Sequence, residues 1–201
     1  MTEMIVSTQS KFYKPVRMRR KKWTRAQYDK AVAAGVFTPA DKIELIEGEL
    51  IQKMPIHPPH TTAIILTQNA LSQILSQDYH VRSQQPIALS NISEPEPDLT
   101  IVAGVPRDFR DSHPQSALLV VEVSDSTLAY DRGTKASMYA KAGIADYWIV
   151  NINERVVEVY RDPVKVNGRG RYQTQLRFVE GESITPLAFE NATIAVNEIL
   201  P

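Results

Sequence analysis

The sequence predicts a mixed α/β (α+β) fold with a central β-sheet flanked by helices, because strand-like and helix-like segments follow one another along the chain. Residues 118–123 are apolar apart from Glu122, as expected of a strand covered on both faces. Ser126 or Thr127 can cap a helix that runs to about Ala142. A buried strand and the helix that follows it therefore form the expected centre of the fold.

Turn and capping signals place the other elements. Thr24 and Gln27 can form a capping box at the start of a helix that Gly35 ends. Turns at Glu47-Gly48 and Asn167-Gly168 predict two β-hairpins in addition to the central sheet. The remaining segments are a helix over 61–75, paired short strands over 79–89, an extended stretch over 94–102, strands over 145–151 and 155–161, and a strand end with a short turn over 193–200.

Length and composition predict one domain of an ordinary soluble protein. The chain has 201 residues, of which 43% are hydrophobic and 23% charged. No apolar run approaches the ~20 residues that cross a bilayer, so we expect no membrane segment. The N-terminus lacks the pattern of a secretory signal, and the absence of cysteine excludes disulfides and cysteine zinc sites. We therefore expect a cytoplasmic protein.

Charge is distributed unevenly. Residues 1–25 contain eight of the 23 Lys and Arg residues and a single acid, Glu3, so the rest of the chain is acidic. We expect residues 1–22 to form a basic N-terminal arm and residues 23–201 to form the domain. Such an arm can bind phosphates with counterion release, or it can be a solvated tail, and the residues leave both interpretations open.

Two acids lie where apolar strand-like segments begin or end. Asp98 precedes the apolar residues 99–102, and Glu122 is near the end of residues 118–123. Adjacent strands can bring two such carboxylates to one ion, and carboxylates suit Mg²⁺ or Mn²⁺. The alternative is that both acids face solvent at strand ends.

Lys135 favours the first interpretation. In the helix that ends near Ala142, Lys135 lies on one face with Asp131, Met138, Tyr139 and Ala142, and this face should pack on the sheet. A buried ammonium needs a negative partner, and Glu122 lies in the preceding strand. An ion pair with Asp131 one turn earlier is the structural alternative. Two carboxylates and an inward lysine suit metal-assisted phosphodiester hydrolysis.

Several motifs occur together in the order of a known family. They are ELIEGEL, His60, EPEPDLTIV, VVEVSDST, DRGTKASMYAKAG and DYWIV. Over roughly residues 24–196 the chain resembles the Uma family of proposed restriction endonucleases, a branch of the PD-(D/E)XK nuclease-like superfamily. The resemblance implies a restriction endonuclease-like core, with the site along one edge of the sheet.

The resemblance also implies roles for individual residues. Asp98 matches the motif aspartate and Glu122 the second acid, both as metal ligands, with the Val123 carbonyl as a further ligand. Glu44 matches an early acid that can complete the metal shell. The commonest superfamily pattern has its lysine two residues after the second acid, where this chain has Ser124. Lys135 takes that role here, from the following helix.

Other polar residues have weaker signals. His57 and His60 are separated by Pro-Pro and cannot share a helical face, which argues against zinc. We expect His60 to cap the next helix or border the cleft. Tyr139 is expected in the core, and the alternative is a hydrogen bond near the site.

The sequence therefore supports a DNA endonuclease that depends on Mg²⁺ or Mn²⁺, with Asp98, Glu122 and Lys135 as its catalytic residues. The alternative is a nuclease-fold protein that binds nucleic acid or a protein partner without cutting. A homodimer is also expected, since exposed hairpins can pair at a sheet edge.

Overall fold

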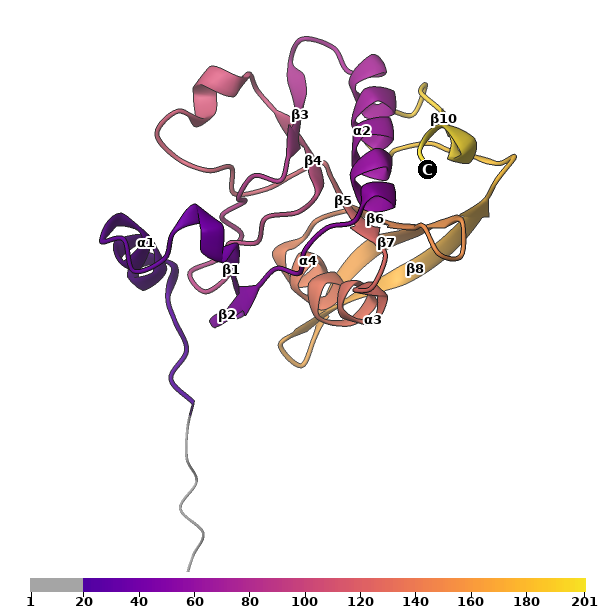
Figure 1. The fold of residues 1–201 in the computed structure, drawn as a ribbon. Coiled ribbons are helices and arrows are strands. Elements are labelled where there is room, and N and C mark those ends of the chain that lie inside the picture. Colours follow the sequence, from indigo (N-terminus) through magenta and orange to yellow (C-terminus); the bar gives the residue numbers. More distant parts are fainter. Residues whose placement is uncertain (1–19) are drawn as a thin grey trace, which may run out of the picture.

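The computed structural model describes residues 20–201, which form a six-stranded mixed sheet with the strand order β3-β4-β5-β6-β7-β8 (Figure 1). Strands β5 and β6 are parallel, and the other neighbours are antiparallel. The strands are β3 (Tyr79–Ser83), β4 (Leu99–Ala103), β5 (Leu119–Ser124), β6 (Asp146–Asn151), β7 (Val156–Val166) and β8 (Arg169–Val179). The predicted mixed sheet flanked by helices is confirmed.

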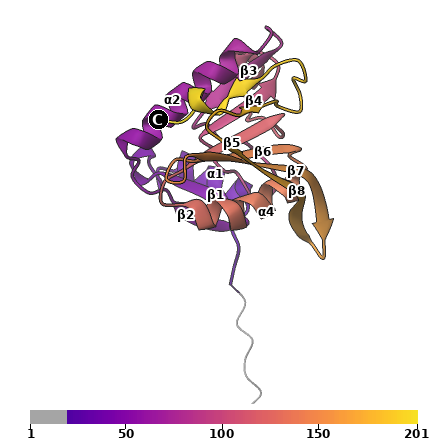
Figure 2. The same cartoon turned by 90° about the vertical axis from the view of Figure 1, so that its right-hand side faces the viewer.

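Helices cover both faces of this sheet (Figure 2). Helix α2 (Pro58–Gln73) packs on one face together with the C-terminal segment, which contains β9 (Ser183–Ile184), β10 (Ile194–Ala195) and a 3₁₀ turn (Val196–Glu198). Helix α4 (Ala136–Ala142) packs on the other face. Because side chains alternate along a strand, Val121 and Val123 face α2 while Val120 lies in the core under α4. The strand is buried on both sides, as its apolar run predicted.

The helix after β5 contains a π-helical turn. It begins as α3 (Leu128–Tyr130), continues through the π-helical residues Asp131–Lys135 and becomes α4, which ends at Gly143 with φ of 84°. Its extent agrees with the prediction, but Ala142 is exposed and does not face the sheet. A π turn takes in an extra residue and so shifts the phase of the residues after it. Ala136 and Ala140 are buried in its place.

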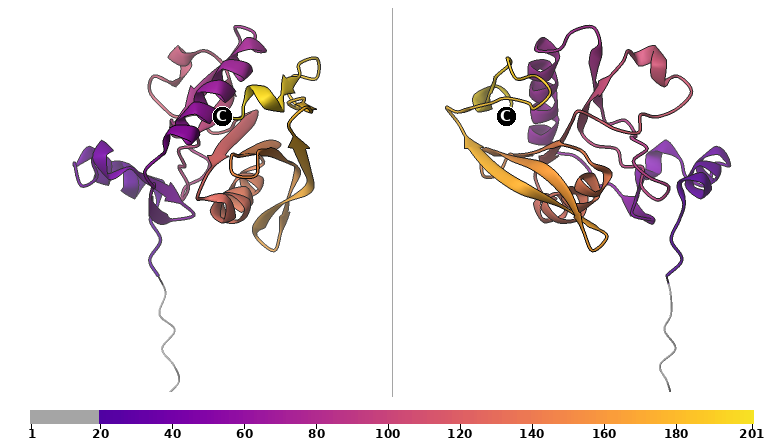
Figure 3. Two further views of the ribbon diagram at one scale, coloured as in Figure 1. Left: turned by 45° about the vertical axis from the view of Figure 1, so that its right-hand side comes forward. Right: turned by 180° about the vertical axis from the view of Figure 1, so that it is seen from behind.

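Both predicted hairpins form, but only β1–β2 is separate from the central sheet, because β7 and β8 are two of its six strands. Strands β1 (Ile43–Ile46) and β2 (Glu49–Gln52) meet at Glu47-Gly48, and β7 and β8 meet at Asn167-Gly168. All four turn residues have positive φ, as tight hairpin turns require. Figure 3 shows the β7–β8 hairpin, in orange, from two sides. A Cβ on Gly170 would lie 2.2 Å from backbone atoms of Ser137 and Lys141, so this glycine lets β8 approach α4 closely.

The N-terminal helix α1 (Arg25–Ala33) has the predicted capping box, with hydrogen bonds between Thr24 and Gln27 in both directions. The prediction of paired strands within residues 79–89 is wrong. Only Tyr79–Ser83 forms a strand, and it pairs with β4. Gln84 has φ of 50° and Pro86 has no amide hydrogen, so the strand cannot continue.

Residues 1–19, most of the predicted basic arm, lie outside the described residues. The boundary at residue 22 therefore stays a prediction. Among residues 20–201 no helix is long and apolar enough to span a bilayer.

Candidate active site

A pocket of about 320 Å³ lies where β4 begins and β5 ends. The pairing of Leu99 with Val121 in the antiparallel β4–β5 ladder puts Asp98 across from Glu122. The predicted residues that line this pocket come from five parts of the chain, and they are Glu44, His60, Asp98, Glu122, Val123 and Lys135. Residues far apart in the sequence are thus brought to one cavity.

Lys135 and Glu122 form a buried ion pair, with 2.9 Å between Nζ and Oε2. Asp131 Oδ1 lies 3.8 Å from the same Nζ, so both acids considered in the sequence contact the lysine, and Glu122 is the closer. Tyr139 donates a hydrogen bond of 2.6 Å to Glu122 Oε1. Tyr139 is therefore both a core residue and a direct partner of the site.

Asp98 is contacted by groups of the neighbouring strand β5 and of α2. Its Oδ2 accepts a hydrogen bond of 2.9 Å from the Val123 amide and lies 3.4 Å from His60 Nε2. His60 is the third residue of α2 and borders the pocket, while His57 is the N-cap residue and makes no side-chain capping bond. Of the two expectations for His60, the cleft-bordering one is confirmed.

Burial raises the pKa of Glu122 to about 7, and neighbouring acids add to this rise while Lys135 opposes it. Burial also lowers the pKa of Lys135, but the surrounding acids outweigh this and raise it, so the ammonium stays charged. For Asp98, burial raises the pKa, but His60, Lys135 and the Val123 amide outweigh it and lower the pKa. Lys135 therefore stays positively charged among several acids.

The pocket has more buried acids than basic partners. Besides Lys135 it contains His60; burial lowers the pKa of His60, but Asp98 outweighs this and raises it. Glu44, Asp98, Glu122 and Asp131 are each at most 6% exposed, against one buried lysine. Buried carboxylates without matching positive charge favour a bound cation. The chemistry of these donors suits Mg²⁺ or Mn²⁺, which take oxygen ligands.

Within the described residues, no three His, Asp or Glu side chains are grouped closely enough to hold a metal ion together. A site for Mg²⁺ does not need three, because Mg²⁺ is commonly bound by one or two carboxylates and keeps several waters. Asp98 and Glu122 therefore fit such an ion. Glu44 lines the pocket and its Oε2 accepts a hydrogen bond from the Glu96 amide, so its role as a ligand stays a prediction.

Three residues of the pocket escaped sequence reasoning. Gln84 Nε2 lies 3.5 Å from Asp98 Oδ1, and no motif marked this residue. The sequence indicates Asp131 only as a structural partner of Lys135, yet Asp131 is 1% exposed and accepts a hydrogen bond of 2.6 Å from Thr127. Tyr130 lines the pocket, and its buried hydroxyl has no partner among the described residues. A free buried hydroxyl beside the acids is consistent with a polar ligand.

The fold is similar to that in the crystal structure of a "putative nuclease belonging to DUF820" from Anabaena variabilis. The TM-score is 0.68 at 16% sequence identity, with 88% of this chain and 96% of that chain covered. This likeness shows that the two proteins share a fold.

The family follows from the sequence. The Uma2 family model, described as "Putative restriction endonuclease", matches residues 26–197, so the chain belongs to the Uma2 family. The resemblance noted from the motifs is thereby confirmed. No protein with curated information matches the chain. The homodimer and the cytoplasmic location stay predictions.

Proposed function

We propose that this protein is an endonuclease that hydrolyses DNA phosphodiester bonds with Mg²⁺ or Mn²⁺. The observation that carries the proposal is the buried contact between Lys135 and Glu122, one strand away from Asp98. A lysine and two acids in one pocket are the groups that metal-assisted phosphodiester hydrolysis needs. Membership of a family described as restriction endonucleases supports nucleic acid as the substrate.

In this proposal Asp98 and Glu122 hold the cation, with the Val123 carbonyl and Glu44 as further ligands. When bound there, the cation would supply Lewis acidity to the phosphate and lower the pKa of a water. Lys135 places its ammonium beside Glu122 and stabilises negative charge that develops at the phosphate. The charge is available throughout the neutral range because the pKa of Lys135 is raised.

His60 and Tyr139 act through the two ligands in this proposal. His60 contacts Asp98 and restricts the orientation of its carboxylate, and Tyr139 does the same for Glu122. Both are therefore positioning residues. Their conservative variants should slow the reaction less than removal of Asp98 or Lys135.

A cleavage assay on plasmid and single-stranded DNA tests the proposal. The wild type should cut with Mg²⁺ or Mn²⁺ and stop in EDTA. Asp98→Asn and Lys135→Ala should be inactive under conditions where circular dichroism shows that each is folded, because loss of Lys135 also lowers stability. Asp111→Asn is the control, since Asp111 pairs with Arg110 on the surface and should not affect cutting. Metal binding without cutting by the wild type would favour the non-catalytic alternative. Equal cutting by wild type and Asp98→Asn would contradict the proposal.

A further inference from the structure

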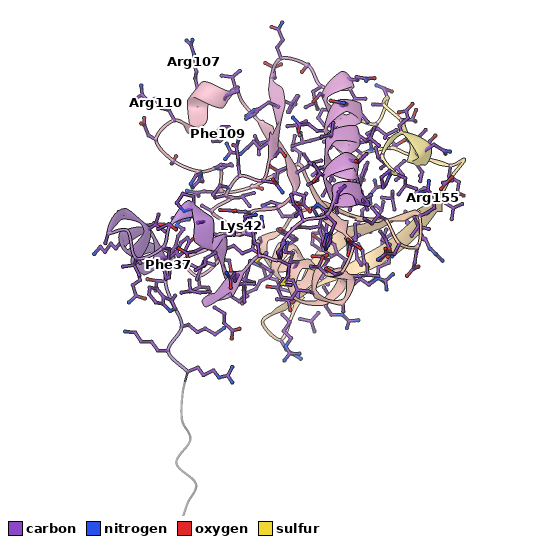
Figure 4. The ribbon with its side chains drawn as sticks, viewed as in Figure 1. Phe37, Lys42, Arg107, Phe109, Arg110 and Arg155 are labelled. Atoms are coloured by element: carbon purple, nitrogen blue, oxygen red, sulfur yellow. The ribbon has the colours of Figure 1, made fainter. Side chains whose placement is uncertain are left out.

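A second groove adjoins the candidate active-site pocket. Its volume is about 410 Å³, and it shares Lys53, Met54, Ile56 and Gln84 with that pocket. The other side of this groove is formed by α1 and the segment that follows it, including Tyr28, Val32 and Phe37. Figure 4 shows Phe37 and Lys42 on this side of the molecule, near α1 and the β1–β2 hairpin. We call this second groove the α1 groove.

The α1 groove gathers exposed apolar side chains. Met54 is 65% exposed, Ile56 45% and Val32 45%, and all three line it. Single exposed apolar residues are ordinary, but several in one hollow mark a binding surface. The aromatic rings of Tyr28 and Phe37 also line the groove. They stack on each other with centroids 6.1 Å apart.

Two lysines and one acid, Glu96, also line this apolar surface, which leaves a net positive charge. Lys42 is exposed and makes no ion pair with a described residue. Lys53 donates a hydrogen bond of 2.9 Å to the Glu96 carbonyl, and its Nζ lies 3.6 Å from the Glu96 carboxylate. Lys53 lines both the α1 groove and the active-site pocket. Aromatic and apolar walls with lysines suit an unpaired nucleobase and its phosphate.

We propose that the α1 groove binds an unpaired nucleobase next to the phosphate that is cut, so that the preferred substrate has a single-stranded segment. This inference rests on the proposed nuclease function. In an intact duplex the base faces are covered by their stacked neighbours, so they cannot contact Met54 or Ile56 unless the strand opens. Lys42 and Lys53 contact the flanking phosphates of the same strand.

Binding measured without cutting tests this proposal. Labelled dT12, a 12-nucleotide strand of abasic residues and a 12-base-pair duplex are titrated with the protein in EDTA. The wild type should bind dT12 more tightly than either of the others. Ile56→Ala should weaken binding of dT12 by about five- to tenfold and leave the abasic strand unchanged, since only the base contacts the isoleucine.

Matched controls separate this groove from general surface effects. Ile65→Ala removes an isoleucine that is 53% exposed on α2 and should bind dT12 as the wild type does. Lys42→Gln should reduce the salt slope of dT12 binding by about 0.7, the value for one phosphate on a single strand. Lys165→Gln, an exposed lysine on β7, should leave the slope unchanged. Because Ile56 is exposed, its variant should fold normally.

Equal affinity of the wild type for dT12 and the abasic strand would overturn the proposal, as would an Ile56→Ala protein that binds dT12 normally. A dimer that Ile56→Ala dissociates, with dT12 binding unchanged, would assign the groove to a second copy instead. None of these measurements depends on cutting. A wild type that cuts plasmid DNA but shows no base-dependent binding would leave the nuclease function intact and remove only this inference.

Discussion

Lys135→Met should destabilise the fold by an amount that depends on pH. The ammonium contacts Glu122 at 2.9 Å and Asp131 at 3.8 Å, and the two acids are 2% and 1% exposed. Removing one partner of a buried ion pair typically costs about 3–5 kcal/mol. Methionine fills similar space, so the loss reflects the charge rather than a cavity.

The pH dependence follows from Glu122. Its pKa is raised from 4.5 in the unfolded chain to about 7 in the folded protein. Glu122 therefore contributes its full stabilisation below pH 4.5, and this stabilisation is lost as the pH rises through 7. Without Lys135, which lowers this pKa, the folded value rises further. Above pH 7 the wild type then ionises Glu122 while the variant does not. The stability difference should therefore widen by up to about 1.4 kcal/mol per pH unit above 7 and stay constant between pH 5 and 7.

Urea unfolding at pH 6, 7 and 8 measures this difference. Lys165→Met serves as the control and should change stability by less than about 0.5 kcal/mol, because this lysine is exposed. A Lys135→Met loss that is the same at pH 6 and pH 8 would refute the coupling of Lys135 to Glu122. A loss below about 1 kcal/mol at pH 8 would show that the pair is not buried in solution.

Three further predictions concern the site and its support. Mn²⁺ affinity, measured by calorimetry, should fall about tenfold per pH unit below 7, because the metal must displace the proton of Glu122. An affinity that does not change with pH would contradict this. Gly170→Ala should lower unfolding stability by at least about 1–3 kcal/mol in thermal melts, whereas Gly133→Ala, which meets no atom within 4 Å, should be neutral or stabilising. Burial raises the pKa of Glu158, but Arg132 outweighs this and lowers it. Glu158→Gln should therefore lower unfolding stability by about 2 kcal/mol at pH 7 and by less below pH 4.5. An equal loss of stability at pH 3 would argue against the ion pair.

Local signals in the sequence predicted the elements around the site. The apolar run with a single acid identified β5, and the helical phase of Lys135 predicted its direction toward the sheet. Asp98 was identified because it directly precedes an apolar segment that reads as a strand. These inferences succeed because burial, alternation and helical spacing are short-range properties of the chain.

The remaining features depend on contacts between distant segments. Gln84 approaches Asp98 only because β3 pairs with β4, and residues 79–89 gave no indication of that partner. The π-helical turn at Asp131–Lys135 and the burial of Ala140 in place of Ala142 are set by packing against the sheet and β8. The α1 groove likewise forms only where α1 lies beside the β1–β2 hairpin and the residues that follow it.

The proposed function depends on the binding of a divalent cation by the buried acids of the pocket. A calorimetric titration of the folded wild type and Glu122→Gln with Mn²⁺ at pH 8 measures this binding. We expect saturable binding by the wild type and loss of that binding in Glu122→Gln. Absence of binding by the wild type, or equal binding by both proteins, would contradict the account.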